Sequence, residues 1–202
     1  MPMRKIAENL ISARNKTDRK TILSKTSRKN DLKLARELKN ICYEFWTSAP
    51  TKTQKTALAL QNLLEINPNE EISALSFWVG GIADLTRGKL ESAIKNFDKS
   101  SEIFQKINKK LESAQTLVAK LIALALLGKY AEAIETGENA IEIFQIYGDE
   151  LAIGKIENNI GSISIRQENL ERAEKSFLSS RKRFLKIQNI SELIVSEIGL
   201  AN

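Results

Sequence analysis

Residues 88–107 read GKLESAIKNFDKSSEIFQKI, and residues 128–147 read GKYAEAIETGENAIEIFQIY. The two stretches lie forty positions apart and share the letters EIFQ, and residues 168–187 (ENLERAEKSFLSSRKRFLKI) follow at the same offset. Repetition at one fixed period is the sequence signature of a repeat architecture. The aligned triplets are Leu90, Tyr130 and Leu170; Ala93, Ala133 and Ala173; and Phe104, Phe144 and Phe184.

Each period contains two predicted helices. In the first period, four residues have the spacing that places side chains on one face of a helix: Ala93, Phe97, Ser100 and Phe104. Gly88 lies just before this helix, where a left-handed cap would end the preceding one. Such a helix pair buries its apolar stripe only by stacking on its neighbours. We therefore predict an all-α fold, a right-handed TPR-like α-solenoid, with helices over residues 73–86, 90–107, 110–127, 130–147, 150–167 and 170–187.

The period also predicts the domain organisation. Three repeats occupy residues 71–188, at 71–108, 109–148 and 149–188, and a degenerate helix pair occupies residues 31–70, with helices over 31–48 and 51–66. Residues 189–202 resemble the first helix of a further, truncated repeat. A terminal repeat needs a polar outer face, so we interpret the chain as the N-terminal part of a longer protein. The apolar side chains expected to be exposed there are Ile194, Ile198 and Leu200.

Composition excludes several classes of site. The chain has 202 residues and no histidine, so no mechanism within it uses imidazole as a base or a metal ligand. Cys42 is the only cysteine, which rules out an internal disulfide and a Cys-based zinc site; we interpret it as a small buried residue. We expect no catalytic residues, no metal and no cofactor. The absence of a secretory signal or a membrane-spanning stretch predicts a cytoplasmic location.

The net charge of +6 is concentrated at one end. Residues 1–40 carry twelve Lys or Arg against four Asp or Glu, and the other 162 residues carry nineteen against twenty-one. Residues 1–30 match no repeat, and three interpretations remain open for them: a flexible basic arm, a capping helix, or a segment that docks on a polyanion. The segment lacks the interleaved aromatic residues that bind single strands by base stacking.

The repeat resembles the tetratricopeptide (TPR) family, whose pattern places an aromatic and a small residue on the first helix and Ala-x3-Phe on the second. Phe77 occupies the aromatic position, and Gly81 and Gly161 the small one. Ala-x3-Phe recurs at 93–97 and 173–177, whereas residues 133–137 end in glycine. The period of forty exceeds the usual ~34 residues, which resembles the longer TPR variants of bacterial signalling proteins.

A narrower resemblance concerns three stretches: ALSFWVGGIADLTRGKLESAI (74–94), AKLIALALLGKYAEAI (119–134) and GDELAIGKIENNIGSI (148–163). Their order is similar to the TPR region of bacterial proteins that end in a CHAT domain, a caspase-like peptidase. This resemblance implies that the repeats act as a sensor or docking module for an effector domain C-terminal to them. With one cysteine and no histidine, that catalytic domain is not in this chain.

The TPR resemblance also implies a binding groove lined by the first helices. Asn158 and Asn159 resemble the paired asparagines that hold the backbone of an extended peptide, and Lys155 and Arg166 would bind a carboxylate. Tryptophan on a helix is more often a core residue than a binding residue, and the basic residues of 170–187 are interpreted as a solvated face. The predicted groove residues are Trp78, Ile82, Gln115, Val118, Ile122, Lys155, Asn158, Asn159, Ser162 and Arg166.

The sequence thus predicts a non-catalytic module that binds a protein or peptide and regulates a larger bacterial signalling or caspase-like protein. Neither nucleic acid nor a membrane is the expected partner. Two alternatives remain open: a nucleic-acid-linked regulator that uses the basic residues 1–30, and a scaffold that self-associates through residues 189–202. Steep salt dependence of binding would distinguish the first of these from groove recognition.

Overall fold

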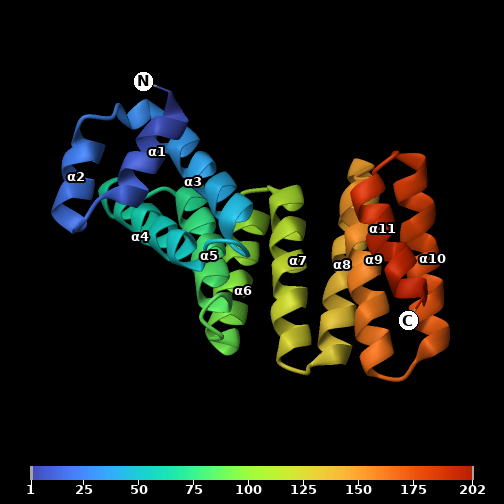
Figure 1. Cartoon of the computed structure of the whole chain (residues 1–202). Coiled ribbons are helices and arrows are strands. Elements are labelled where there is room, and N and C mark those ends of the chain that lie inside the picture. Colours follow the sequence, from blue (N-terminus) through green and yellow to red (C-terminus); the bar gives the residue numbers. More distant parts are fainter. Residues whose placement is uncertain (1, 202) are drawn as a thin grey trace. The chain divides into compact units, whose positions relative to one another are not determined.

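The computed structural model describes residues 2–201, which form helices and no strand (Figure 1). The predicted all-α class is confirmed. A short 3-10 helix, Arg28–Asn30, precedes α3. The α-helices are α1 (Met3–Ser12), α2 (Lys16–Ser24), α3 (Asp31–Phe45), α4 (Pro50–Ile66), α5 (Glu70–Leu85), α6 (Leu90–Lys106), α7 (Lys110–Leu126), α8 (Tyr130–Tyr147), α9 (Glu150–Arg166), α10 (Leu170–Lys186) and α11 (Ile190–Ala201).

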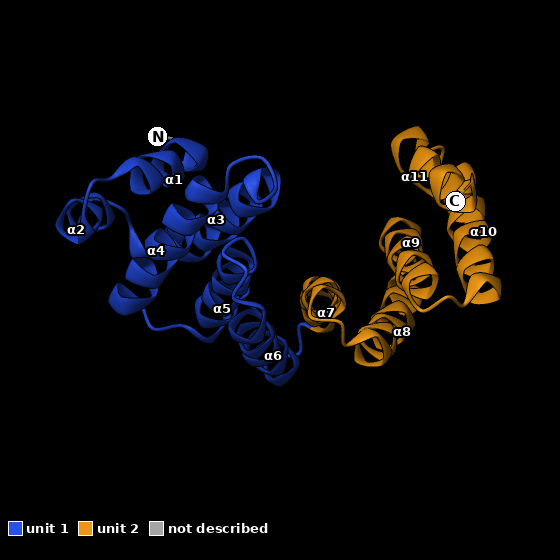
Figure 2. Ribbon diagram, turned by 60° about the horizontal axis from the view of Figure 1, so that its bottom comes forward, with its two compact units in different colours: residues 1–109 blue, residues 110–202 orange. Residues whose placement is uncertain are grey.

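The helices fall into two compact units (Figure 2). Unit 1 extends to Lys109 and contains α1 to α6, and unit 2 begins at Lys110 and contains α7 to α11. In unit 1, α5 packs on α6, and α3 and α4 pack against α5. In unit 2, α7 pairs with α8 and α9 with α10, and α11 packs on both α9 and α10.

The helix boundaries confirm the predicted pairs, and the turns between helices repeat with the same period. The turn within each pair has one residue in the left-handed region, at Gly88 (φ 70°), Gly128 (φ 80°) and Glu168 (φ 59°). The amide of the next residue then donates to a carbonyl of the preceding helix, as Lys89 N does to Asp84 O at 3.0 Å. This geometry caps the orphan carbonyls at a helix end. Glycine is therefore the favoured residue at this turn.

Size complementarity brings the two helices of each pair together. In the first pair, a Cβ added to Gly81 on α5 would lie 2.5 Å from Phe97 Cε1 on α6. In the second pair the roles are reversed, because a Cβ added to Gly137 on α8 would lie 2.6 Å from Leu121 Cδ1 on α7. The third pair returns to the first arrangement, with Gly161 against Phe177. Gly137 stands where the Ala-x3-Phe pattern has phenylalanine, and its small size leaves room for the Leu121 side chain.

The N-terminal residues fold against the helix pair that follows them. Ala7, Leu10 and Ile11 of α1 and Leu23 of α2 are buried, and both helices contact α4. Arg19 is buried as well, and its guanidinium donates to Leu10 O and Ala13 O, each at 3.2 Å. These residues therefore belong to the folded unit and do not form a flexible arm.

Helix α11 exposes an apolar face. Ile194 and Ile198 are exposed, as expected, while Leu200 is half-buried. Within residues 2–201, no helix is both long enough and apolar enough to span a bilayer.

Candidate functional site

Four of the predicted groove residues meet at a surface depression between α7 and α9, within unit 2. The depression has a volume of about 110 Å³. Ile122 comes from α7, and Asn159, Ser162 and Arg166 come from successive turns of α9. Residues at such spacings share one face of a helix. The full lining is Leu121, Ile122, Ala125, Leu126, Asn159, Ser162, Ile163 and Arg166.

The two walls of the depression differ in chemistry. The α7 wall is aliphatic, and its Leu126 side chain is 57% exposed. The α9 wall presents an amide, a hydroxyl and a guanidinium. Ser162 Oγ donates to Asn158 O at 3.0 Å, which fixes its rotamer on the helix. The depression therefore offers an apolar contact next to three polar groups, of which Ser162 is held in place by a hydrogen bond.

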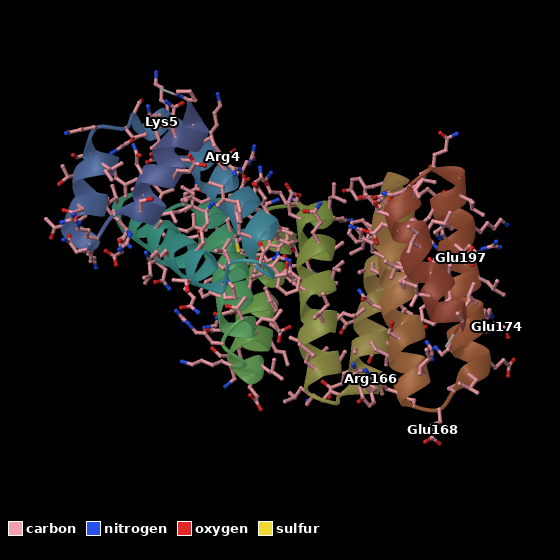
Figure 3. All side chains as sticks on the ribbon, in the orientation of Figure 1. Arg4, Lys5, Arg166, Glu168, Glu174 and Glu197 are labelled. Carbon is pink, nitrogen blue, oxygen red and sulfur yellow. The ribbon has the colours of Figure 1, made fainter. Side chains whose placement is uncertain are left out.

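Arg166 is the charged group of this site. It is exposed at the C-terminal end of α9 (Figure 3), and it makes no ion pair or hydrogen bond with any side chain among the described residues. The Asn159 side chain likewise makes no hydrogen bond within that part of the chain. Both groups are therefore available to a ligand, and a guanidinium is suited to bidentate binding of a carboxylate.

Three further predicted residues flank the depression. Gln115 and Val118 are half-buried on α7, two turns and one turn before Ile122 respectively. Lys155 is exposed on α9, but its Nζ lies 2.8 Å from Glu192 Oε1 of α11. Lys155 therefore connects α9 to α11 and does not line the depression.

Two predicted residues lie in the core of unit 1 instead of on an accessible surface. Trp78 is 1% exposed and Ile82 is 3% exposed. The Trp78 Nε1 donates to Tyr43 Oη at 3.0 Å, and its ring makes edge contacts with Tyr43 and Phe104. The prediction that Trp78 and Ile82 line a groove is wrong, because both side chains are buried in the core of unit 1, where α3 packs against α5.

Asn158 is also buried, at 5% exposure. Its Oδ1 accepts hydrogen bonds from Ser180 Oγ of α10 at 2.5 Å and from Ser196 Oγ of α11 at 3.0 Å. Its Nδ2 is buried without a partner among the described residues. Of the two adjacent asparagines, only Asn159 faces the depression, because consecutive residues of a helix point about 100° apart.

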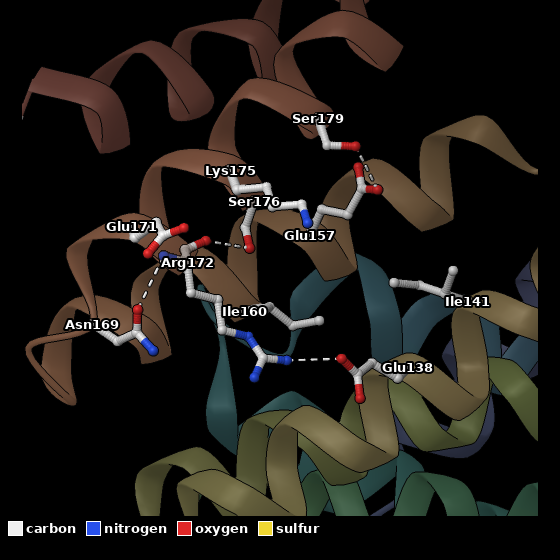
Figure 4. A pocket seen from close by; sticks show the side chains of 10 residues that line it. All are labelled: Glu138, Ile141, Glu157, Ile160, Asn169, Glu171, Arg172, Lys175, Ser176 and Ser179. Atoms are coloured by element: carbon white, nitrogen blue, oxygen red, sulfur yellow. Dashed lines mark hydrogen bonds and ion pairs between the residues drawn. The ribbon is translucent and has the colours of Figure 1, made fainter.

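A larger depression, about 560 Å³, lies between α8, α9 and α10 (Figure 4). This depression was not predicted from the sequence, and two of its lining residues, Arg172 and Lys175, were interpreted as part of a solvated face. Most of its charged groups have partners within the chain. Arg172 Nη2 lies 2.7 Å from Glu138 Oε1, and Glu157 accepts from Ser179 Oγ at 2.8 Å and from Arg183 Nε at 2.9 Å. A ligand would have to break these contacts, so this depression is the weaker candidate.

Two kinds of reactive site, a metal centre and a cysteine nucleophile, can be checked in the described part of the chain. It holds no cluster of three or more His, Cys, Asp or Glu that could bind a metal ion. Cys42 is fully buried, and burial raises the pKa of its thiol from 9.0 to about 12. A thiol that stays protonated at neutral pH is a poor nucleophile.

Comparisons with known proteins agree with the repeat geometry. A sequence model of the tetratricopeptide repeat matches residues 71–146. The fold is similar to the crystal structure of aspartyl phosphate phosphatase F from Bacillus subtilis, with a TM-score of 0.76 and 14% identity. The match covers 91% of this chain but 48% of the phosphatase chain, so this chain spans about half of that protein. No curated protein matches the sequence. Residues 71–146 thus match tetratricopeptide repeats, and the chain has the fold of a TPR-like helical-repeat protein.

Proposed function

We propose that the chain is a non-catalytic recognition module that binds a segment of a partner protein at the depression between α7 and α9. TPR-like repeats are typically protein-interaction modules, and their stacked helices present extended binding surfaces. The observation that carries the proposal is the unpaired Arg166 guanidinium beside an aliphatic depression. The ligand is a peptide segment with an apolar side chain next to a carboxylate.

The size of the depression favours a side chain over a small-molecule cofactor. Cofactor and drug-like sites have volumes of about 300–1,000 Å³, whereas this depression has about 110 Å³. One aliphatic side chain of the partner would contact Ile122 and Leu126 there. Burial of that side chain contributes about 1.5–3 kcal/mol.

Polar groups on α9 would then fix the orientation of the segment. A carboxylate, from an acidic side chain or a chain terminus, would accept two hydrogen bonds from Arg166. The Asn159 amide has a donor and an acceptor that match the backbone of an extended segment. Each charge-assisted hydrogen bond is worth roughly 1.5–3 kcal/mol.

The proposal includes a regulatory role in the cytoplasm. Its support is the resemblance of residues 74–94, 119–134 and 148–163 to the repeats that precede CHAT domains. In such an arrangement, binding at the repeats would control a caspase-like effector domain.

A pull-down from the source lysate, read by mass spectrometry, tests the site. The bait proteins are the wild-type chain, an Asn159→Ala, Arg166→Ala variant and a Lys182→Ala control. Lys182 is exposed on α10 and has no side-chain partner among the described residues. Asn158 and Trp78 are left intact, because changing either would disturb the core.

A partner recovered by the wild type is then measured by calorimetry. We expect the double variant to raise its Kd by about 10- to 100-fold, which corresponds to the loss of about one charge-assisted hydrogen bond. The Lys182→Ala control should bind like the wild type. If all three baits bind the partner equally, the α7/α9 depression is not the binding site.

A further inference from the structure

The α2 region of unit 1 carries an excess of exposed, unpaired positive charge. Between residues 2 and 33, seven cationic side chains are exposed and have no ion pair or hydrogen bond with the described residues. Four of them fall within residues 20–29. The seven are Lys5, Arg14, Lys20, Lys25, Arg28, Lys29 and Lys33.

The carboxylates of this region do not compensate for these charges. Glu8 lies 3.3 Å from Arg4, and Asp31 is buried, where its Oδ2 accepts from Asn67 Nδ2 at 3.1 Å. The carboxylate of Glu65, on α4, pairs with Lys16 at 2.8 Å and also interacts electrostatically with Lys20. Only Asp18 remains exposed without a side-chain partner in the described chain. The local field is therefore strongly positive.

Two depressions adjoin the segment that joins α2 to α3, and hydroxyl groups line both. Thr26 borders both depressions. The first, about 440 Å³, is also lined by Thr21, Lys25 and Ser27. The second, about 320 Å³, is also lined by Lys20, Ser24 and Arg28, by the buried Asp31, and by Leu23, Leu63 and Ile66. Thr21, Ser24 and Thr26 each donate their hydroxyl proton to a backbone carbonyl of α2. The groups available to bind phosphate oxygens are therefore the cationic N–H groups and the Ser27 hydroxyl.

We propose that this basic segment, residues 20–33, binds the phosphate backbone of a nucleic-acid duplex. Specific interfaces with nucleic acid are polar and strongly positive. Between residues 2 and 42, no large apolar side chain is exposed. The segment therefore lacks the apolar core of a protein–protein interface and the apolar anchor of a membrane-surface helix.

The residues that line the two depressions also favour binding of a duplex over binding of a single strand. No aromatic side chain lines either depression, and single-strand binders rely on base–aromatic stacking. Cationic side chains without stacking platforms bind the sugar–phosphate backbone independently of sequence.

The backbone that carries these cations is held in place by the core. Leu23 of α2 is 4% exposed, and Arg19 is buried with its guanidinium bonded to two carbonyls. Deleting residues 1–30 would open this core. Charge reversal at exposed side chains tests the proposal without that damage.

Fluorescence anisotropy of the full chain with short labelled duplexes, one DNA and one RNA, measures the binding over a range of salt concentrations. The test variant is Lys25→Glu, Arg28→Glu, Lys29→Glu. The matched control is Lys55→Glu, Lys95→Glu, Lys182→Glu, which makes the same change in net charge at exposed, unpaired lysines elsewhere. Circular dichroism checks that both variants keep the wild-type helix content.

We expect wild-type affinity to fall linearly with the logarithm of salt concentration. Loss of three phosphate contacts should make that slope shallower by about three and weaken binding by about tenfold or more at low salt. The control should lose much less. Equal tightness for DNA and RNA indicates backbone recognition alone, and a preference for one identifies the duplex bound.

Four results would overturn the proposal. They are an equal loss in both variants, tighter binding to a single strand than to a duplex, tighter binding to polyglutamate, and tighter binding to anionic vesicles. None of them bears on the α7/α9 site, because the substitutions leave its residues unchanged.

Discussion

At the scale of single residues, the pairing of a small side chain with a large one sets how closely two helices approach. Gly81 faces Phe97 in the first pair, and Gly137 faces Leu121 in the second. These are equivalent positions with the sizes exchanged, since 81 and 121, and 97 and 137, differ by the period of forty. Tight packing requires that the total volume at such a crossing be conserved.

This exchange predicts a measurable coupling in the first pair. Gly81→Leu alone should overpack the crossing and cost about 1–3 kcal/mol, and Phe97→Gly alone should leave a cavity and cost about 3–5 kcal/mol. In the double variant the leucine fills that cavity. The double variant should therefore lose less free energy of unfolding, measured by urea denaturation, than the two single variants lose in sum. The difference should be about 1 kcal/mol or more. Gly80→Leu is the control, because the nearest atom to an added Cβ there is Asn96 Nδ2 at 3.8 Å. Additive effects in the Gly81 cycle would contradict the size exchange.

Cys42 predicts how stability depends on pH. Burial raises the pKa of its thiol from 9.0 to about 12. Between these two values of pH, the thiol is protonated in the folded chain and ionised in the unfolded chain. The stabilisation is therefore fully present below pH 9.0 and is lost as pH rises toward 12. Between about pH 8 and pH 10 the free energy of unfolding should fall by about 1.4 kcal/mol more in the wild type than in Cys42→Ala. Denaturant melts at both pH values measure this difference, and parallel pH profiles would exclude it.

At the scale of elements, α11 docks through Gly199, which packs against the Phe177 ring of α10, and through a buried polar contact at Ser196. Ser196 is its one buried residue among those described, and its Oγ donates to Asn158 Oδ1. At the surface, Arg181 lies 2.5 Å from Glu197. Exposed ion pairs contribute only about 0–1 kcal/mol.

The Ser196 contact should contribute measurably to the docking of α11. Ser196→Ala removes the hydrogen bonds that Ser196 Oγ makes with the buried Asn158 Oδ1 and Ser180 Oγ, at 3.0 and 2.8 Å. The loss should cost about 1–3 kcal/mol locally. Hydrogen exchange followed by mass spectrometry should show faster exchange in residues 190–201, with α7 to α10 unchanged. Ser191→Ala, at an exposed position, should leave exchange as in the wild type. Uniform acceleration over unit 2 would mean that α11 is not a separate element.

The same scale shows which features the sequence could predict. Helices and turns depend on local chemistry that recurs every forty residues, and the boundaries of α8 match the predicted 130–147. The α9 wall of the α7/α9 depression could be predicted from the sequence, because helical spacing places Asn159, Ser162 and Arg166 on one face. Which faces are covered depends on packing with other helices. Trp78 was wrongly predicted to line the groove, because α3 packs on α5. Asn158 was wrongly predicted to do so, because Ser180 of α10 and Ser196 of α11 form hydrogen bonds with its side chain.

At the scale of the whole chain, the two compact units carry the two proposed activities separately. The α7/α9 depression lies entirely after Lys110, and the basic segment entirely before Lys109. Repeat helices contact mainly their neighbours, so the stability of an array is close to a sum of local terms. Each unit also has its own buried aromatic residues, Phe97 and Phe104 in unit 1 and Phe144 and Phe184 in unit 2.

We therefore predict that fragments 1–109 and 110–202 fold independently and divide the activities. Each should show a helical circular dichroism spectrum and a cooperative thermal transition, because each retains a closed core. Fragment 110–202 should bind the partner peptide with a Kd within about threefold of the full chain and should not bind a duplex. Fragment 1–109 should do the reverse, with a salt slope equal to that of the full chain. A fragment that is unfolded alone would show that its core depends on the other unit. Fragments that fold but bind neither ligand would mean that each site needs residues from both units.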